Sequence, residues 1–235
     1  MSTQHGSGGG EMLAMIPDGR TDKVHEHLAA GGAADIEIGG ASLLQWCAHH
    51  GDVSALRLLL MHGARIDSLG ANLDLGGAAF HGHWQLVEFL LEQGADPRHA
   101  DPATGETALH LALSRANRPR RLRIVRALLA AGADPNAPTM AGVDTGAFMR
   151  DSRTRGETPL HRAAAFADAS TIECLLAAGA DPARTDAHGD SPLSWASWHL
   201  RPAAVLRLLC FGPHRLHPDN DSSYDHGQGW QLSER

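Results

Sequence analysis

Short apolar helical patterns occur in pairs along most of the chain. The clearest pair lies between residues 156 and 181. Its first helix is predicted after Thr158, whose hydroxyl can cap it, with Pro159 at the first helical position, where no amide donor is needed. Its second helix carries an apolar stripe at residues 172–176 and ends at Gly179, because glycine readily takes the left-handed conformation of a helix C-terminus. The pattern predicts two short helices joined by a turn.

The end of this pair is a Gly-Ala landmark that recurs along the chain. It is found at Gly32, Gly63, Gly94, Gly132 and Gly179, with a degenerate copy at Gly212. The successive intervals are 31, 31, 38, 47 and 33 residues. A repeat of this period indicates stacked helical hairpins, and each longer interval locates an insertion. The larger insertion lies within residues 139–155.

The segment Gly-Glu-Thr-Pro-Leu-His-Arg-Ala-Ala at residues 156–164 closely resembles the ankyrin repeat, whose signature is T-P-L-H-x-A with a period of about 33 residues. Residues 107–112 and 191–196 carry weaker copies, and Leu-Asp-Leu-Gly replaces the signature at residues 73–76. The resemblance implies an all-α ankyrin-repeat solenoid of helix-turn-helix units with short β-hairpin-like connecting loops.

The repeats set the expected domain organisation. We expect a flexible N-terminus at residues 1–10 and about six repeats over residues 11–212, the first and last being atypical caps. Residues 213–235 are polar and lack a helical period, which predicts a C-terminal tail.

The resemblance also implies roles for residues inside the repeats. In ankyrin repeats the signature histidine hydrogen-bonds nearby backbone, so a structural role is expected for His110 and His161. The three cysteines, Cys47, Cys174 and Cys210, match helix core positions and suggest inert packing. Their odd number and wide spacing indicate no disulfide framework and a reducing compartment.

Charge and hydropathy limit the classes of partner. The chain has 20 Lys and Arg against 27 Asp and Glu, a net charge of −7, which argues against general attraction to nucleic acid or membrane. The first ten residues lack the features of a signal peptide, and no apolar run is long enough to span a bilayer. We therefore expect a cytoplasmic protein that binds neither nucleic acid nor membrane and needs no cofactor.

The resemblance implies a concave groove formed by the last positions of each first helix and by the hairpin tips. Solvated helix faces favour Lys, Glu and Gln, but these positions carry rings and imidazoles, which are typical of protein-binding surfaces. The predicted non-enzymatic partner site on the helices consists of His49, His50, Phe80, His81, Arg115, Phe166, Trp198 and His199. The hairpin tips add Asn72, Glu106, Glu157 and Asp190.

Two other interpretations of these residues stay open. The rings can instead form a local core beneath the insertion or the tail. The second interpretation is a metal or acid–base site formed by the histidines, but no HExxH or paired CxxC spacing supports a metal. If the groove histidines take part in binding, affinity is expected to change between about pH 6 and 7, where unperturbed imidazoles titrate.

An arginine cluster occupies the junction between the two helices of the fourth repeat. It comprises Arg115, Arg118, Arg120, Arg121, Arg123 and Arg126, with no acidic residue between them. A solvated helix start is one interpretation. The other is a docking patch for an acidic or phosphorylated segment, with Arg118, Arg120, Arg121 and Arg123 as candidates. The cluster is too short to indicate DNA binding.

The insertion at residues 139–155 carries Val143, Phe148 and Met149, so it is expected to be ordered and to fold against the hairpin edge or over the groove. This position suggests an alternative function. A small-molecule site or enzyme beneath the insertion would use Asp74 or Asp144 with His81 as an acid–base pair. The altered signature at residues 73–76 supports it, because a break in a local rule without structural gain is typical of functional sites.

Overall fold

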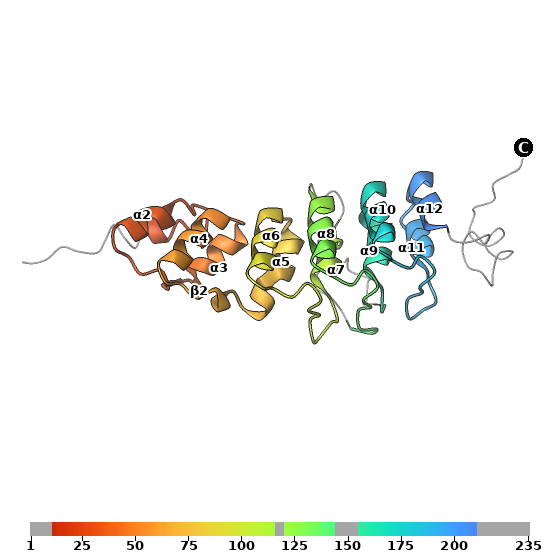
Figure 1. The fold of residues 1–235 in the computed structure, drawn as a ribbon, viewed down its shortest axis with the longest axis horizontal. Coiled ribbons are helices and arrows are strands. Elements are labelled where there is room, and N and C mark those ends of the chain that lie inside the picture. Colours follow the sequence, from red (N-terminus) through yellow and green to blue (C-terminus); the bar gives the residue numbers. More distant parts are fainter. Residues whose placement is uncertain (1–10, 116–119, 144–154, 211–235) are drawn as a thin grey trace, which may run out of the picture. The chain divides into compact units, whose positions relative to one another are not determined.

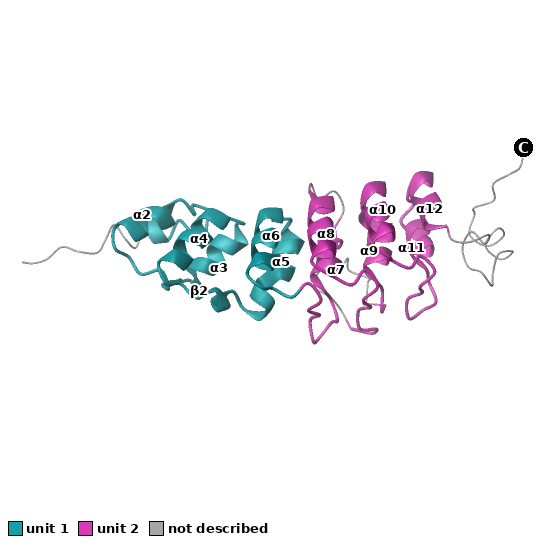
Figure 2. Cartoon of the chain, in the orientation of Figure 1, with its two compact units in different colours: residues 1–96 teal, residues 97–235 magenta. Residues whose placement is uncertain are grey.

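The computed structural model describes residues 11–115, 120–143 and 155–210, and most of these residues are helical (Figure 1). They belong to two compact units, residues 1–96 and residues 97–235 (Figure 2). The predicted flexible N-terminus, the C-terminal tail and residues 144–154 of the insertion lie outside the described residues.

Unit 1 contains three helical repeats and one short hairpin. Its elements are α2 (Lys23–Ala29), β1 (Glu37–Ile38), β2 (Ala41–Ser42), α3 (Leu43–His49), α4 (Val53–Met61), η1 (Ile66–Leu69), η2 (Ala71–Asp74), α5 (Leu75–His81) and α6 (Trp84–Glu92). The two strands pair antiparallel, with Glu37 opposite Ser42. Helix α3 packs on α4, and α5 packs on α6. The two helix pairs also contact each other, α3 with α5 and α4 with α6.

Capping side chains fix where the unit 1 helices begin. The Oγ of Ser42 accepts a hydrogen bond from Gln45 N at 3.1 Å, and the Gln45 side chain accepts one from Ser42 N at 2.8 Å. This reciprocal capping box satisfies two backbone donors that have no partner inside the helix. Asp52 caps α4 through Ala55 N and also accepts a hydrogen bond from the Thr21 hydroxyl. The Asp52 carboxylate therefore joins the first repeat to the second.

Unit 2 contains three further helix pairs. They are α7 (Ala108–Ala112) with α8 (Arg121–Ala130), α9 (Pro159–Phe166) with α10 (Ala169–Ala177), and α11 (Pro192–Trp198) with α12 (Ala203–Leu209). Pro159 and Pro192 stand at the first position of α9 and α11, and Gly179 follows α10 with a φ of 91°, as the sequence predicted. Ala163, Ala164 and Ala196 are fully buried, and these small side chains let α9 and α11 pack closely.

The signature histidines connect neighbouring repeats of unit 2. His110 Nδ1 accepts a hydrogen bond from Thr107 N at 3.2 Å, so the ring proton must be on Nε2, which donates to the Glu157 carbonyl at 3.3 Å. His161 repeats this arrangement with Thr158 N and the Asp190 carbonyl. Both rings are fully buried. The predicted structural role of the two histidines is confirmed.

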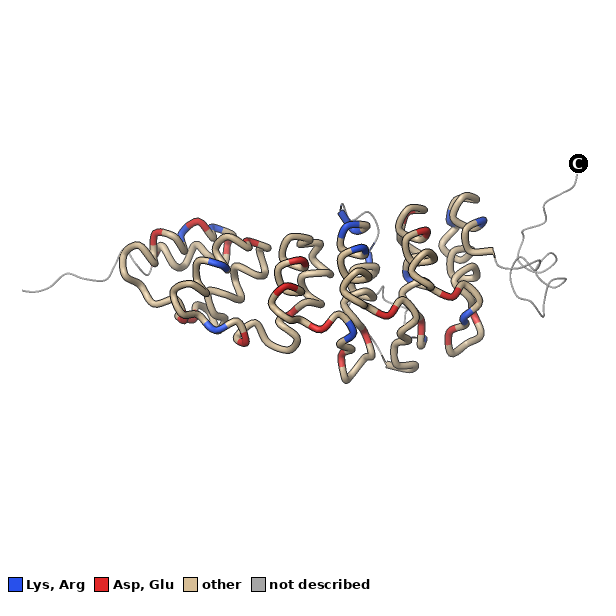
Figure 3. Tube along the Cα trace, viewed as in Figure 1, with Lys and Arg blue, Asp and Glu red and all other residues tan. Residues whose placement is uncertain are grey.

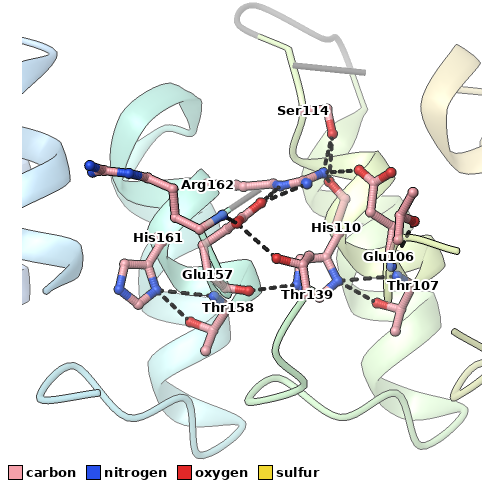
Figure 4. A network of polar contacts seen from close by, with 11 residues as sticks. Glu106, Thr107, His110, Ser114, Thr139, Glu157, Thr158, His161 and Arg162 are labelled. Atoms are coloured by element: carbon pink, nitrogen blue, oxygen red, sulfur yellow. Dashed lines mark hydrogen bonds and ion pairs between the residues drawn. The ribbon is translucent and has the colours of Figure 1, made fainter. Parts of the chain in front are cut away.

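A buried ion cluster joins the fourth repeat to the fifth (Figure 4). The Arg162 side chain has no exposed surface, and Glu106 and Glu157 are 8% and 2% exposed. Arg162 donates to Glu157 Oε1 from Nε at 3.0 Å and from Nη2 at 2.7 Å, and to Glu106 Oε1 from Nη1 at 2.7 Å. Ser114 Oγ lies 2.7 Å from the same Nη1. Because buried charges are costly unless paired and hydrogen-bonded, this geometry is what keeps the guanidinium inside.

The second oxygen of Glu157 ties together the two ends of the insertion. Glu157 Oε2 accepts hydrogen bonds from the Thr139 hydroxyl at 2.8 Å and from Arg155 N at 2.7 Å. Burial pushes the pKa of Glu157 upward, but the charge of Arg162 and the hydrogen bonds it accepts outweigh burial, so the pKa is lowered overall. The base of the insertion is thus held by the same carboxylate that neutralises Arg162.

Removal of the buried guanidinium tests the importance of the cluster. Arg162→Met should lower the free energy of unfolding by about 3–5 kcal/mol, because Glu106 and Glu157 would be left buried without a cation. Urea unfolding followed by circular dichroism measures the loss. The triple variant Arg162→Met, Glu106→Gln, Glu157→Gln is the control and should recover part of it. A loss below about 1 kcal/mol in the single variant would contradict this role.

Acid should destabilise the protein, because the two buried signature histidines have lowered pKa values in the folded state. Burial and the charge of Arg162 lower the pKa of His110 to about 3, and burial lowers the pKa of His161. Below the unfolded pKa of about 6.5, the unfolded chain binds protons that the folded chain does not. The free energy of unfolding should therefore fall by up to about 1.4 kcal/mol per pH unit for each histidine. Lowering of the Glu157 pKa adds a loss that begins near pH 4.5.

The matched variant for this pH dependence is His161→Gln. Glutamine at this position can accept from Thr158 N, as Gln45 does from Ser42 N in unit 1, so the cap is kept while one titrating group is removed. The slope of the unfolding free energy against pH should become smaller below about pH 6.5, because His161 no longer contributes to the difference in bound protons between the unfolded and folded chains. An unchanged slope would show that His161 titrates normally in the folded protein.

Candidate functional site

The predicted ring surface of unit 1 is built from the C-terminal ends of α3 and α5. The rings of His49 and His81 lie 5.3 Å apart at 71°, and both residues are exposed. Phe80 is half-buried and its ring lies 5.3 Å from that of His81. His49 also packs edge-on against Trp46, at 6.2 Å. The structure thus brings together three predicted residues and one that was not predicted.

Two histidines beside this surface hold backbone carbonyls. The ring of His50 lies 5.0 Å from that of His49, but its Nε2 is 3.1 Å from the Pro17 carbonyl in the first repeat. His83 Nε2 is 2.9 Å from the His49 carbonyl, and its ring stacks on His81. These contacts fix the end of α3. His50 therefore has a structural contact in addition to its predicted place at the partner surface.

A cavity of about 330 Å³ lies where α3, α5 and the η1–η2 segment meet. It is lined by Gly40, Ala41, Gln45, Trp46, Ala48, His49, Leu69, Asp74, Gly77, Ala78 and His81. Asp74 accepts a hydrogen bond from Gly77 N at 3.1 Å and caps α5. Partial burial of the carboxylate raises the pKa of Asp74, and the Gly77 hydrogen bond and nearby His49 oppose this rise. The cavity is therefore polar on the Asp74 side.

Backbone strain surrounds this cavity in the altered third repeat. Asn72, Leu73 and Asp74 have φ values of 48°, 55° and 54°, three consecutive left-handed residues without a glycine among them. The side-chain amide of Asn72 forms two hydrogen bonds with the backbone of Asp96, at 2.8 and 2.7 Å. Left-handed non-glycine residues are costly and persist only where their surroundings hold them. Asn72 holds this segment, so it is a scaffold residue of the cavity.

The predicted residues of unit 2 gather at the end of α11. Trp198 is 47% exposed; its ring stacks on Trp195 at 6.4 Å and has the Arg155 guanidinium 5.2 Å from its centroid. Phe166 and His199 are half-buried, and their rings meet edge-on at 4.9 Å. Burial, and then the charge of Arg201, lower the pKa of His199. Trp198 is thus the most exposed ring of this group.

The tip residues were not all placed as expected. Glu106 and Glu157, expected at exposed hairpin tips, lie in the buried cluster because Arg162 needs both carboxylates. Asp190 is half-buried and its carboxylate lies 3.3 Å from Arg155 Nη1. Burial, and then the neighbouring charge of Asp186, raise the pKa of Asp190. Only Asp190 of these three keeps a partly accessible carboxylate.

The arginine cluster is divided between surface and interior. Figure 3 shows basic residues along α8. Arg115, Arg120 and Arg123 are exposed, and Arg118 lies outside the described residues. Arg121 is 5% exposed and its Nη1 donates to the Phe166 carbonyl at 2.9 Å. The expectation that Arg121 is available for anion docking is therefore corrected, since its guanidinium is used to hold the end of α9.

The cysteines differ in exposure. Cys47 is fully buried, and burial raises the pKa of its thiol to about 12, which makes it unreactive. Cys174 is half-buried and Cys210 is exposed, so the expectation of core packing is wrong for Cys210, which follows the last turn of α12. All three are free thiols.

No group of three or more His, Cys, Asp or Glu side chains within the described ranges is placed to hold a metal ion. None of the helices in the same ranges has the length and apolar character needed to cross a bilayer.

Sequence reasoning missed Arg162 and Trp46. Arg162 directly follows the signature histidine and lies five residues after Glu157 in an otherwise apolar helix, which was a signal for a buried pair. Trp46 lies within α3, three residues before His49, outside the last positions of the first helices that the repeat register assigns to the partner surface. Its indole Nε1 donates to the Ile38 carbonyl at 2.9 Å and fixes the ring at the cavity.

Comparison with known proteins identifies similar chains. Mouse palmitoyltransferase ZDHHC13 is 30% identical over 184 residues, which cover 66% of this chain and 28% of the relative. Human rabankyrin-5 is 34% identical over 125 residues, covering 51% of this chain and 10% of the relative. Human neurogenic locus notch homolog protein 2 is 36% identical over 157 residues, covering 57% and 6%. The chain spans less than a third of the length of these curated relatives.

Family models give the broader relationship. The model described as three copies of ankyrin repeats matches residues 75–139, and the single ankyrin-repeat model matches residues 39–71 and 155–187. Together they cover more than half of the chain, and the matched segments contain the helix pairs from α3 to α10. The predicted all-α repeat fold is thereby confirmed. The chain belongs to the ankyrin-repeat family.

Proposed function

We propose that the chain is a non-enzymatic module that binds another protein through the ring-bearing ends of its first helices. Ankyrin repeats are generally protein–protein interaction modules and are generally not enzymes. The observation that carries the proposal is the exposed Trp198 at the end of α11, 47% exposed and held in place by Trp195 and Arg155. A rigid, partly exposed tryptophan offers a large contact area at low entropic cost.

Neighbouring side chains extend this surface in unit 2. Leu200 is 87% exposed and adopts a φ of 50°, which is unusual for a leucine. The ring of Phe166, at the end of α9, and the ring of His199, directly after α11, form an edge-to-face pair. His199 is the residue before Leu200. An apolar residue held at the surface in a costly conformation supports a recognition role rather than packing.

The corresponding surface of unit 1 consists of His49, Phe80 and His81, with the cavity beside them. Their ring contacts keep the side chains in fixed orientations before a partner arrives, which reduces the entropy lost on binding. His50 and Asn72 support this surface through their backbone contacts.

Two secondary roles follow from single observations. Arg115, Arg120 and Arg123 are exposed and could receive an acidic or phosphorylated segment of the partner. The small-molecule or enzymatic alternative retains Asp74 and His81, which line one cavity, whereas Asp144 lies outside the described residues. We favour binding over reaction, because ankyrin repeats are generally not enzymes.

The interaction surface of unit 2 can be tested by truncating its rings. The double variant Trp198→Ala, His199→Ala should reduce capture of specific binding proteins at least about tenfold, because loss of a hot-spot aromatic costs roughly 2 kcal/mol or more. Quantitative mass spectrometry of proteins retained by the immobilised chain measures the effect.

Met61→Ala is the matched control, since Met61 is a large apolar side chain, 82% exposed, on a second helix. It should retain the same proteins as the unmodified chain. Equal recovery of every protein by the double variant and by Met61→Ala would contradict the proposed surface.

A further inference from the structure

The cavity beside α3 and α5 has a composition that selects the charge of its occupant. Asp74 is the one carboxylate among its lining residues. Its carboxylate accepts a hydrogen bond from Gly77 N, at the start of α5. Asp74 is exposed, so a ligand can reach its carboxylate, and a carboxylate favours a cationic hydrogen-bond donor. Burial raises the pKa of Asp74, and a cation bound beside the carboxylate would oppose that rise.

The cations of unit 1 are engaged with other carboxylates. Residues 1–96 contain four Lys and Arg against twelve Asp and Glu, which gives a net charge of −8 with histidine neutral (Figure 3). The four pairs are Arg20 with Asp22, Lys23 with Glu26, Arg57 with Glu92 and Arg65 with Asp67. None of these pairs involves Asp74, so a Lys or Arg that pairs with it has to come from outside the described residues of unit 1; within the unit, the nearby charge that acts on Asp74 is that of His49. The acidic surroundings would also steer a basic ligand towards it.

The walls of the cavity suit a long basic side chain. The Trp46 indole, fixed by its hydrogen bond to Ile38, presents a ring that can contact a cation. Leu69, Ala48 and Ala78 provide apolar walls for a methylene stem. A volume of about 330 Å³ lies at the small end of ligand sites, so the cavity has room for an inserted side chain but not for a helix.

The strained backbone of residues 72–74 supports a preformed binding site. Residues 72–74 are consecutive left-handed residues that bring Asp74 to the cavity, and the Asn72–Asp96 hydrogen bonds hold them there. Gly77 is needed as well, because a Cβ at this position would lie 2.5 Å from the Asp74 carboxylate oxygens. Strained segments of this kind concentrate at ligand sites. The site is therefore preorganised.

We propose that this cavity binds one arginine or lysine side chain from an extended basic segment of a partner protein. The cationic head pairs with Asp74 and contacts Trp46, and the stem lies along Ala78 and Leu69. The inference rests on the proposed interaction function and specifies the chemistry of its partner. It does not involve the Trp198 surface, so the two can fail separately.

An NMR titration of the full chain with blocked peptides tests the pocket. The probe is Gly-Gly-Arg-Gly-Gly with both ends blocked, and its control replaces arginine by citrulline, which has the same shape without the charge. The arginine peptide should shift the Gly40 and Gly77 amides and the Trp46 indole signal. The citrulline peptide should bind at least about fivefold more weakly, because a charge-assisted hydrogen bond is lost.

Two variants that each remove one negative charge distinguish binding in the cavity from general electrostatic attraction to the acidic unit. Asp74→Asn keeps a capping side chain on α5 and should weaken the arginine peptide at least about fivefold. Glu92→Gln removes one charge from an exposed pair on α6 and should change affinity by less than about twofold. Equal weakening by both variants would overturn the pocket in favour of non-specific attraction.

Two outcomes on the unmodified chain also overturn the proposal, so it does not depend on how Asp74→Asn folds. Equal affinity for arginine and citrulline peptides would exclude a cationic guest. Tighter binding of free L-arginine than of the peptide would show that the guest is a small molecule and not a partner segment. If the arginine peptide binds as expected while Trp198→Ala, His199→Ala retains every captured protein, the pocket stands and the unit 2 surface fails.

Discussion

The Arg162 guanidinium, without any exposed surface, is the constraint on which the interior of unit 2 depends. It needs two carboxylates, and these come from the entry turns of two successive repeats, Glu106 before α7 and Glu157 before α9. A buried ion pair of this type contributes little over an apolar core, but breaking it leaves charge buried and is strongly destabilising. The cluster therefore fixes the register of one repeat on the next, and Glu157 also holds the base of the insertion through Thr139 and Arg155.

Several polar side chains of unit 2 serve the interior of the repeats rather than the surface. The signature imidazoles are used inside the repeats, because Nδ1 accepts from the helix cap and Nε2 donates to the next turn. Glu106 and Glu157 are used in the ion cluster, and Arg121 is used on the Phe166 carbonyl. In the described residues, the proposed recognition would use the helix-end rings and the cavity of the third repeat. The third repeat can host a cavity because a strained segment has replaced its signature.

Much of the fold could be predicted from the sequence because its determinants are local. Thr158 and Pro159 start α9, and Gly179 ends a helix with positive φ, since capping depends on neighbouring residues only. The ion cluster could not be predicted in the same way. Arg162 and Glu106 are far apart in sequence, and an arginine after the signature resembles a solvated helix residue until the next repeat covers it.

The candidate site was predictable in part. The helix-end positions of His49, His81 and Trp198 follow from repeat register, and the structure places their rings in contact with neighbouring rings. The left-handed run at residues 72–74 has no sequence signature, because it depends on a side chain bonding backbone that lies 24 residues further on. A hairpin-tip carboxylate is buried where it pairs with a buried cation, as Glu106 and Glu157 do with Arg162. Repeat register alone does not predict such a pair.

The central claim is that the polar groups of the repeat signature are buried, neutral or paired, and bind one repeat to the next. Long-range proton–nitrogen NMR spectra of the histidine rings test it most directly. His110 should show the neutral form with the proton on Nε2, unchanged from about pH 7 to about pH 5, and His161 should show the same form at about pH 6.5, where a free imidazole is half protonated. Titration of either ring near pH 6.5, or a proton on Nδ1, would contradict the account.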